Sequence, residues 1–144
     1  IERGAERFGS QCIVVAVDGK RTGEDEWRVY THGGREPRDR TVVEWCREVE
    51  ERGAGEILLT SMDTDGTKDG YDLPMLERVS RSVNIPVISS GGAGEPQDFV
   101  DVFRETEASA ALAASVFHYD QHPVPEVKEY CRENDVPIRP LWKE

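Results

Sequence analysis

Four polar segments follow apolar runs in this chain, and their residue types could bind an anion or transfer a proton. Asp18 directly follows the apolar residues 13–17. Residues 61–70 contain carboxylates and two glycines, residues 90–94 contain three glycines, and residues 114–115 follow a run rich in alanine. Carboxylates suit general acid and base catalysis, whereas glycine-rich turns expose backbone N–H groups to anions.

The glycines and small residues predict a phosphate site. Unhindered backbone N–H groups would come from Gly91, Gly92, Ala114 and Ser115, and Gly66 could add a further one. The alternative is that these glycines only form tight turns. Neither a Walker-type lysine motif nor a GxGxxG motif is present, which disfavours a nucleoside triphosphate or dinucleotide site. No cofactor is therefore expected.

Asp18 is the first candidate for proton transfer, because a carboxylate at the end of a buried strand is partly desolvated. Asp63 and Asp65 lie two residues apart after the next strand, near enough to influence each other. Any such aspartate could instead form a turn or cap a helix. The three histidines form no cluster, so no metal site is expected. Glu56 opens its strand at the opposite end, where a solvated strand edge is the simplest explanation.

Apolar runs and turn residues predict the elements that position these segments. β-branched runs indicate buried strands, and N-cap residues followed by helical spacing of apolar residues indicate helices. The first strand reads as buried on both faces. The predicted strands are 12–17, 56–61, 86–90 and 108–114, with a small hairpin around 27–31. The predicted helices end near Gly9, run from Thr41 to Gly53, begin at Asp72 and Pro96, and run from Pro125 to about Asn134.

The alternation of strands and helices predicts an α/β fold with parallel strands joined by right-handed crossovers. Two architectures fit this order: a flavodoxin-like layered sheet, or a (β/α)₄ half of a TIM (β/α)₈ barrel. In both, functional residues gather at the C-terminal ends of the strands, where all four polar segments lie. The length of 144 residues suits a single domain that spans residues 1–144.

The composition disfavours several classes of partner and location. With 29 acidic and 18 basic residues the net charge is -11, which disfavours binding to nucleic acid or to an anionic membrane. The acidic, lysine-poor surface resembles that of halophile proteins from a high-salt cytoplasm. No signal peptide or membrane-spanning run is present, so a cytoplasmic protein is expected. The three cysteines are widely spaced and are expected to be buried, reduced thiols.

Taken together, the motifs closely resemble the cyclase subunit of imidazole glycerol phosphate synthase. The resemblance rests on VVAVD at 14–18, GAGEILLTSMDTDGTK at 53–68, SGGAG at 90–94 and AASVFH at 113–118. It runs from about residue 5 to about residue 135 and covers only the second half of the family's barrel, strands five to eight. The start at Ile1 agrees with a fragment of a longer barrel.

The resemblance implies a reaction of histidine biosynthesis. Ammonia from a glutaminase partner subunit reacts with a bis-phosphorylated formimino-aminoimidazole carboxamide ribonucleotide, and imidazole glycerol phosphate and AICAR are formed. Asp18 matches one of the family's two acid/base aspartates, and Asp65 matches a further active-site carboxylate. Glu56 matches a charged residue at the barrel bottom, where ammonia enters. The positions that match one substrate phosphate site are Gly66, Gly92, Ala114 and Ser115.

The family's first acid/base aspartate, its other phosphate site and four of its strands have no counterpart here, so the fragment alone is expected to be inactive. An open half-barrel exposes strand edges and an apolar inner face, which predicts a dimer or a larger homo-oligomer. One alternative is the sister phosphoribosylformimino-AICAR-ribotide isomerase, although residues 60–66 and 114–118 fit the cyclase better. Another is a non-catalytic half-barrel that binds phosphate.

Overall fold

Six strands form one sheet, and four of them run parallel. The structure is a computed structural model that describes residues 1–139. Across the sheet the order is β3-β2-β1-β4-β5-β6. Strand β2 pairs antiparallel with both β3 and β1, whereas β1, β4, β5 and β6 pair in parallel. The strands are β1 (Val14–Arg21), β2 (Trp27–Thr31), β3 (Glu36–Thr41), β4 (Glu56–Ser61), β5 (Val87–Ser90) and β6 (Ala110–Leu112).

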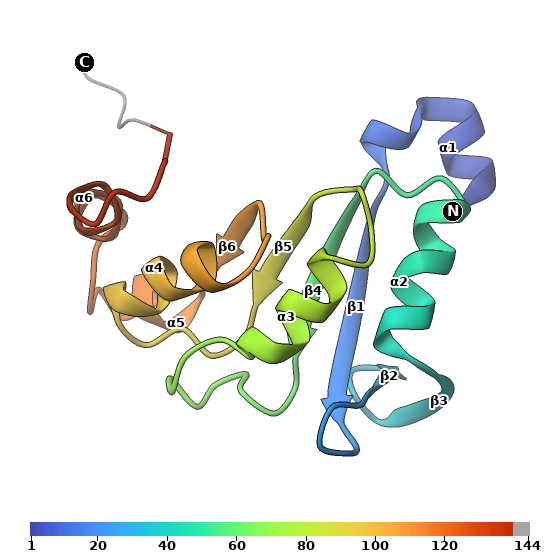
Figure 1. The fold of residues 1–144 in the computed structure, drawn as a ribbon, viewed down its shortest axis with the longest axis horizontal. Coiled ribbons are helices and arrows are strands. Elements are labelled where there is room, and N and C mark those ends of the chain that lie inside the picture. The colour runs from blue at the N-terminus through green and yellow to red at the C-terminus, as the bar shows by residue number, and fades with distance from the viewer. Residues whose placement is uncertain (140–144) are drawn as a thin grey trace.

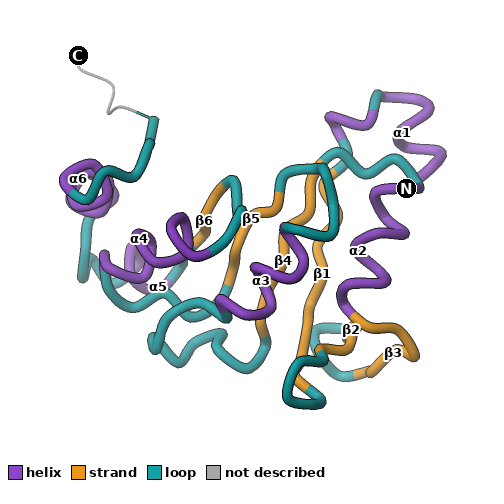
Figure 2. Tube along the Cα trace, in the orientation of Figure 1, coloured by secondary structure: helices purple, strands orange, loops and turns teal. Residues whose placement is uncertain are grey.

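Helices alternate with the parallel strands along the chain, as predicted. They are α1 (Glu2–Phe8), α2 (Val42–Glu51), α3 (Leu73–Ser80), α4 (Pro96–Glu105), α5 (Ser115–His118) and α6 (Val124–Glu133), with a short 3-10 helix, η1 (Ser10–Cys12). Figure 1 shows α2, α3 and α4 side by side on one face of the sheet, and the tube in Figure 2 shows the same layering. Helix α6 packs against α4. No helix within residues 1–139 is long and apolar enough to cross a membrane.

Capping residues explain where the helices begin. The N–H of Glu44 donates to Thr41 Oγ1 at 3.2 Å, and the N–H of Thr41 donates to Glu44 Oε2 at 3.0 Å, which completes a capping box at α2. Asp72 caps α3 by accepting from the N–H of Met75 at 3.2 Å. Pro96 occupies the first position of α4, where its missing N–H costs nothing. All three helices begin as predicted.

Only one face of the sheet is buried. Ile57 and Leu59 on β4 are fully buried under the helices, together with Val17 on β1 and Val87 on β5. Side chains alternate along a strand, so the residues between them face the other way. On that second face Val14 is 51% exposed. A flavodoxin-like fold would cover both faces with helices, so the uncovered face favours a partial barrel.

The sheet is not closed, because β3 and β6 form its two edges. An open, mainly parallel sheet with helices on its outer face is the arrangement of a partial TIM barrel. The apolar second face corresponds to the inside of such a barrel. The half-barrel prediction is therefore confirmed.

The first strand differs from its prediction. It begins at Val14, and Cys12 lies in η1 with an exposed side chain, so the predictions that Cys12 belongs to the strand and is buried are wrong. The strand is also not buried on both faces, because no second layer covers the side on which Val14 lies. It continues to Arg21 because its last residues pair with the hairpin strand β2. Strand β3 was not predicted, since its sequence is charged and almost entirely exposed.

Candidate functional site

The C-terminal ends of the parallel strands lie at one edge of the sheet, as the sequence predicts. The register pairs Asp18 with Thr60, Thr60 with Ser90, and Ser90 with Leu112, which forms one row across four strands. These residues belong to the open face of the sheet. The loops that follow β4, β5 and β6 therefore meet beside this row.

Those three loops enclose a cavity of about 180 Å³. Every residue that the sequence predicts for the phosphate site lines it, and so does Asp65. Ser90 and Leu112, from the row at the strand ends, also line the cavity, and so does Lys68. The predicted phosphate residues in the lining are Gly66, Gly91, Gly92, Ala114 and Ser115. Segments as far apart in the sequence as Asp65 and Ser115 are thus brought together around one small cavity.

Several backbone N–H groups at this cavity have no acceptor in the part of the chain that the structure describes. Within residues 1–139, the N–H groups of the five predicted phosphate residues donate to no protein acceptor. Gly92 is nevertheless buried. A buried N–H group without an acceptor costs about 1–3 kcal/mol, so such groups normally face a ligand or water. Gly92 is the one buried donor of the five. The other four are exposed or half-buried, and the group as a whole has donors that suit an anion.

Two of these glycines are also required for the loops to pack. The N–H of Gly70 donates to Gly92 O at 2.9 Å, and Thr64 Oγ1 donates to Gly91 O at 3.0 Å. Gly92 has φ 110°, and a Cβ there would lie 2.0 Å from Gly70 O. Gly66 differs, because a Cβ at its position would meet nothing within 4 Å. Turn formation and anion binding are therefore compatible explanations of the same loop.

Asp18 lies at the same edge but outside the cavity. It is partly buried on the open face, next to Thr60 in the register of β4. Its carboxylate makes no hydrogen bond or ion pair with any residue of the described chain, so it is free to act on a bound molecule. One strand, β4, separates β1 from β5, so roughly 10 Å lies between the backbone of Asp18 and that of the phosphate loop. A phosphorylated molecule of ordinary metabolite size spans that distance.

The two neighbouring carboxylates Asp63 and Asp65 have different environments. Asp63 Oδ2 accepts a 2.7 Å hydrogen bond from the N–H of Arg21, which ties the loop after β4 to the end of β1. Asp65 is exposed, lines the cavity and has no side-chain partner within residues 1–139. The structure thus gives Asp63 an anchoring role and leaves Asp65 available to a ligand.

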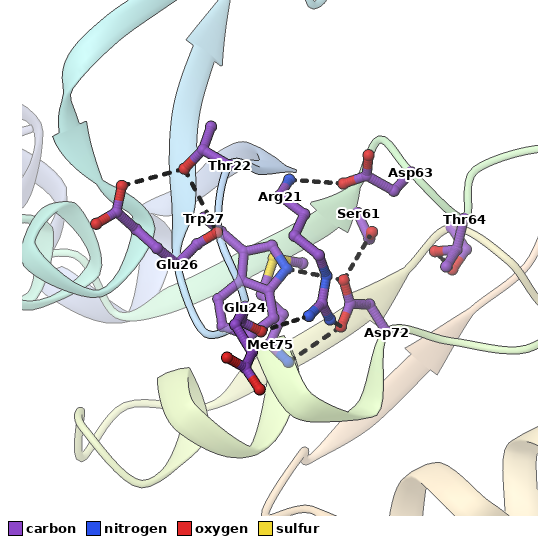
Figure 3. Close-up of polar contacts among 11 residues, drawn as sticks. Arg21, Thr22, Glu24, Glu26, Trp27, Ser61, Asp63, Thr64, Asp72 and Met75 are labelled. Carbon is purple, nitrogen blue, oxygen red and sulfur yellow. Dashed lines mark hydrogen bonds and ion pairs between the residues drawn. The ribbon is translucent and has the colours of Figure 1, made fainter.

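A buried carboxylate that sequence reasoning treated only as a helix cap anchors the same region. Asp72 is 6% exposed and accepts from four donors (Figure 3). Its Oδ1 accepts from Arg21 Nη2 and from the N–H of Met75, both at 3.2 Å. Its Oδ2 accepts from Trp27 Nε1 at 2.9 Å and from Ser61 Oγ at 3.3 Å. The hairpin, β4 and α3 are joined at this one side chain.

Sequence spacing gives little warning of this cluster, because its members come from four separate segments. One available signal is that Trp27 and Arg21 flank the tip of a short hairpin, where an indole N–H must find an acceptor once buried. Arg21 also lies over the Trp27 ring, with its guanidinium carbon 4.5 Å from the ring centroid. The cluster positions the loop after β4 without lining the cavity.

Glu56 lies at the opposite edge of the sheet. It pairs in register with Val14 at the start of the strands, and its side chain is partly buried. Within the described residues its carboxylate has no hydrogen-bond or ion-pair partner. Six residues of strand, roughly 16–20 Å, separate it from the end of β4. The structure therefore does not bring Glu56 together with the cavity residues.

The histidines of residues 1–139 lie in no cluster of potential metal ligands. Residues 1–139 contain no group of three or more histidine, cysteine, aspartate or glutamate side chains placed to hold a metal ion. His122 instead connects two carboxylates, with Nδ1 2.8 Å from Glu126 Oε1 and Nε2 3.1 Å from Glu95 Oε2. The bond to Glu126, aided by the charge of Glu95, raises the pKa of the His122 imidazole.

The sequence of this chain is similar to those of known proteins. The family model described as "Histidine biosynthesis protein" matches residues 1–123. The chain is 60% identical over 140 residues to the imidazole glycerol phosphate synthase subunit HisF of Anoxybacillus flavithermus, covering 96% of this chain and 56% of the relative. It is 54% identical to the same subunit of Bacillus cereus and 53% identical to that of Hydrogenobaculum, each over 96% of this chain and 55% of the relative. The chain thus spans about half the length of the curated relatives it matches.

Proposed function

Because this chain belongs to the histidine biosynthesis protein family, we propose that it supplies one phosphate-binding half of an imidazole glycerol phosphate synthase cyclase. The cyclase converts the phosphoribulosyl-formimino-AICAR ribonucleotide and ammonia to imidazole glycerol phosphate and AICAR. The relatives bear the name of the HisF subunit, so the sister isomerase is not favoured.

One observation carries this proposal: five residues whose N–H groups have no acceptor within residues 1–139 line a cavity at the C-terminal edge of a partial barrel. Preorganised amide donors suit a phosphate oxygen, because they need no side-chain ordering and no change of protonation. The cavity has room for one phosphate group and not for a whole nucleotide. The remainder of the substrate would then extend over the open face, toward Asp18.

Asp18 is the proposed acid/base residue on this half. Its carboxylate has no partner among residues 1–139 and shares a row with Thr60, so it lies on the face along which the substrate would extend. A carboxylate so placed could accept a proton from the attacking amine and return it to a leaving nitrogen. Asp65, beside the phosphate cavity, is proposed to orient the same substrate.

Residues 1–144 alone should bind phosphate without completing the reaction. The half-barrel has one open face and two open edges, and the relatives are nearly twice as long. The resemblance assigns a second aspartate and a second phosphate site to a half that these residues do not include. A cavity that binds only one phosphate of a bis-phosphorylated substrate cannot hold the substrate in a reactive geometry.

Two kinds of partner follow from the proposal. A glutaminase subunit would dock at the edge where the strands begin and deliver ammonia past Glu56, whose carboxylate has no partner within the described residues. The open apolar face would be covered by a complementary half-barrel or, in its absence, by a second copy of this chain.

Reconstitution tests this function. The chain is mixed with the N-terminal half of the Anoxybacillus relative, and ammonia-dependent formation of imidazole glycerol phosphate is followed. Turnover by the mixture, with neither half active alone, is the expected result. If the mixture forms a stable complex yet yields no product at saturating ammonia, the cyclase assignment fails.

A further inference from the structure

Lys68 stands in an unusual backbone conformation beside the cavity. Its φ is 65°, in the left-handed region that residues other than glycine and asparagine rarely adopt. The backbone packs closely here, because a Cβ on Gly94 would lie 2.3 Å from Lys68 O. Glycine or asparagine at position 68 would adopt this conformation at less cost. Strained residues of this kind are concentrated at binding and catalytic sites.

The charge of Lys68 is also distinctive. Among the described residues that line the cavity, Lys68 is the single cation and Asp65 the single anion. The chain has a net charge of -11, so its overall field repels a phosphate dianion. Backbone N–H groups supply partial positive charge, but they do not neutralise a nearby carboxylate. A full positive charge at the cavity would do so.

The ammonium group is held in place by the segment that follows α5. Lys68 Nζ donates to Gln121 Oε1 at 2.9 Å and lies 5.9 Å from the centroid of the Tyr119 ring. The N–H of Gln121 in turn donates to Val116 O at 3.1 Å, which fixes this segment to α5. An ammonium group has three N–H donors, so two remain available for a ligand.

We propose that Lys68 supplies the cationic group of the phosphate site, binding the phosphate together with the backbone donors. This inference rests on the proposed function and adds a residue that determines its specificity for a dianion. The Lys68 side chain extends from the loop after β4 to the segment after α5. The ammonium then offsets Asp65 and makes the cavity attractive to a phosphomonoester.

Binding of inorganic phosphate to the 144-residue chain tests this role. Lys68→Met removes the charge, Lys68→Arg keeps it, and Lys128→Met is the matched control. Lys128 also donates one hydrogen bond, to Arg139 O at 3.2 Å, but it is half-buried and lies on α6, away from the cavity. Lys68→Met should raise the Kd roughly ten-fold, whereas Lys128→Met should leave it within about two-fold. The dependence of Kd on salt should weaken in Lys68→Met alone.

A fourth variant separates binding from folding. Lys68→Gly removes the charge and the backbone strain together, so it should weaken phosphate binding as Lys68→Met does while keeping or raising the melting temperature. Equal Kd values for Lys68→Met and Lys128→Met would overturn the role of Lys68 and leave the phosphate site standing. Failure of the unaltered chain to bind phosphate would overturn the proposed function and this role with it.

Discussion

The indole Nε1 of Trp27 donates a 2.9 Å hydrogen bond to Asp72 Oδ2 and so joins the hairpin to the first turn of α3. Trp27 is 2% exposed and Asp72 is 6% exposed, so neither group exchanges this bond for water. Ser61 and Arg21 donate to the same carboxylate. The loop that carries Asp65 leaves β4 at Ser61, and this buried carboxylate therefore fixes where the loop begins.

Replacing Asp72 by alanine should lower the free energy of unfolding by about 2–3 kcal/mol, because buried donors and the Arg21 guanidinium lose their acceptor. The partial exposure of Arg21 keeps the effect below that of a fully buried ion pair. Urea denaturation followed by tryptophan fluorescence measures it. Asp69→Ala removes an exposed carboxylate from the same loop and should change the unfolding free energy by less than about 0.5 kcal/mol. Equal effects would contradict the anchoring role.

Local sequence signals account for most of the elements. Thr41, Asp72 and Pro96 mark helix starts because the caps act over three or four residues, and those boundaries are seen in the structure. The run 56–61 was predicted to its exact ends because the helices bury every second side chain of it. Each of these signals involves residues that are close in the sequence, so the sequence alone predicts the element.

Features that depend on distant pairing were not predictable in the same way. Strand β3 forms only because β2 lies beside it, and its charged residues show no strand pattern. The exposure of Val14 depends on whether a second layer is present, which a β-branched run does not reveal. The residues that line the cavity could be grouped in advance because strand ends converge on one edge of the sheet. The hydrogen bond from Arg21 to Asp63 could not, because it joins positions 42 residues apart.

The cysteines should differ sharply in reactivity. Cys12 is exposed, whereas burial raises the pKa of the Cys46 thiol to about 12 and also raises the pKa of Cys131. Only the thiolate reacts with iodoacetamide, so Cys12 should be alkylated in the native protein and the other two only after unfolding. Peptide mass spectrometry measures the order, and Cys12→Ser should leave the native protein unlabelled. Simultaneous labelling of all three would contradict the burial of Cys46 and Cys131.

His122 should make stability depend on pH. Its imidazole pKa is raised in the folded state, chiefly by the bond to Glu126 and further by Glu95, so the folded state binds the proton more tightly than the unfolded state. The resulting stabilisation is fully present below about pH 6.5, the unfolded pKa, and is lost as pH rises through the folded pKa. His122→Gln should therefore lower the melting temperature more at about pH 5.5 than at about pH 8.5. His118→Gln, at an exposed residue, is the control; a pH-independent difference for His122→Gln would contradict the linkage.

The open face should drive self-association of residues 1–144. Leu58 and Ile88 are register partners on this face, and Val14 and Leu112 are 51% and 43% exposed. Pairing with a second copy would cover them and satisfy the free strand edges. Light scattering should give at least twice the mass of one chain. Leu58→Lys should yield monomers, whereas Asn84→Lys adds the same charge at an exposed loop residue and should not. A monomeric unaltered chain at micromolar concentration would rule out this association.

Variants at Asp18 and Asp65 should affect turnover and phosphate binding differently. Asp18 does not line the cavity, so Asp18→Asn should leave the Kd for inorganic phosphate unchanged. In the reconstituted mixture it should lower turnover by roughly 10²–10⁴-fold, because the amide cannot accept the proton. Asp65 lines the cavity, and Asp65→Asn removes a negative charge beside the bound anion. Phosphate should then bind several-fold more tightly, by roughly 1 kcal/mol of relieved repulsion, while turnover falls. Near-normal turnover by Asp18→Asn would remove Asp18 from the acid/base role, and weaker phosphate binding by Asp65→Asn would place that carboxylate among the groups that support the loop.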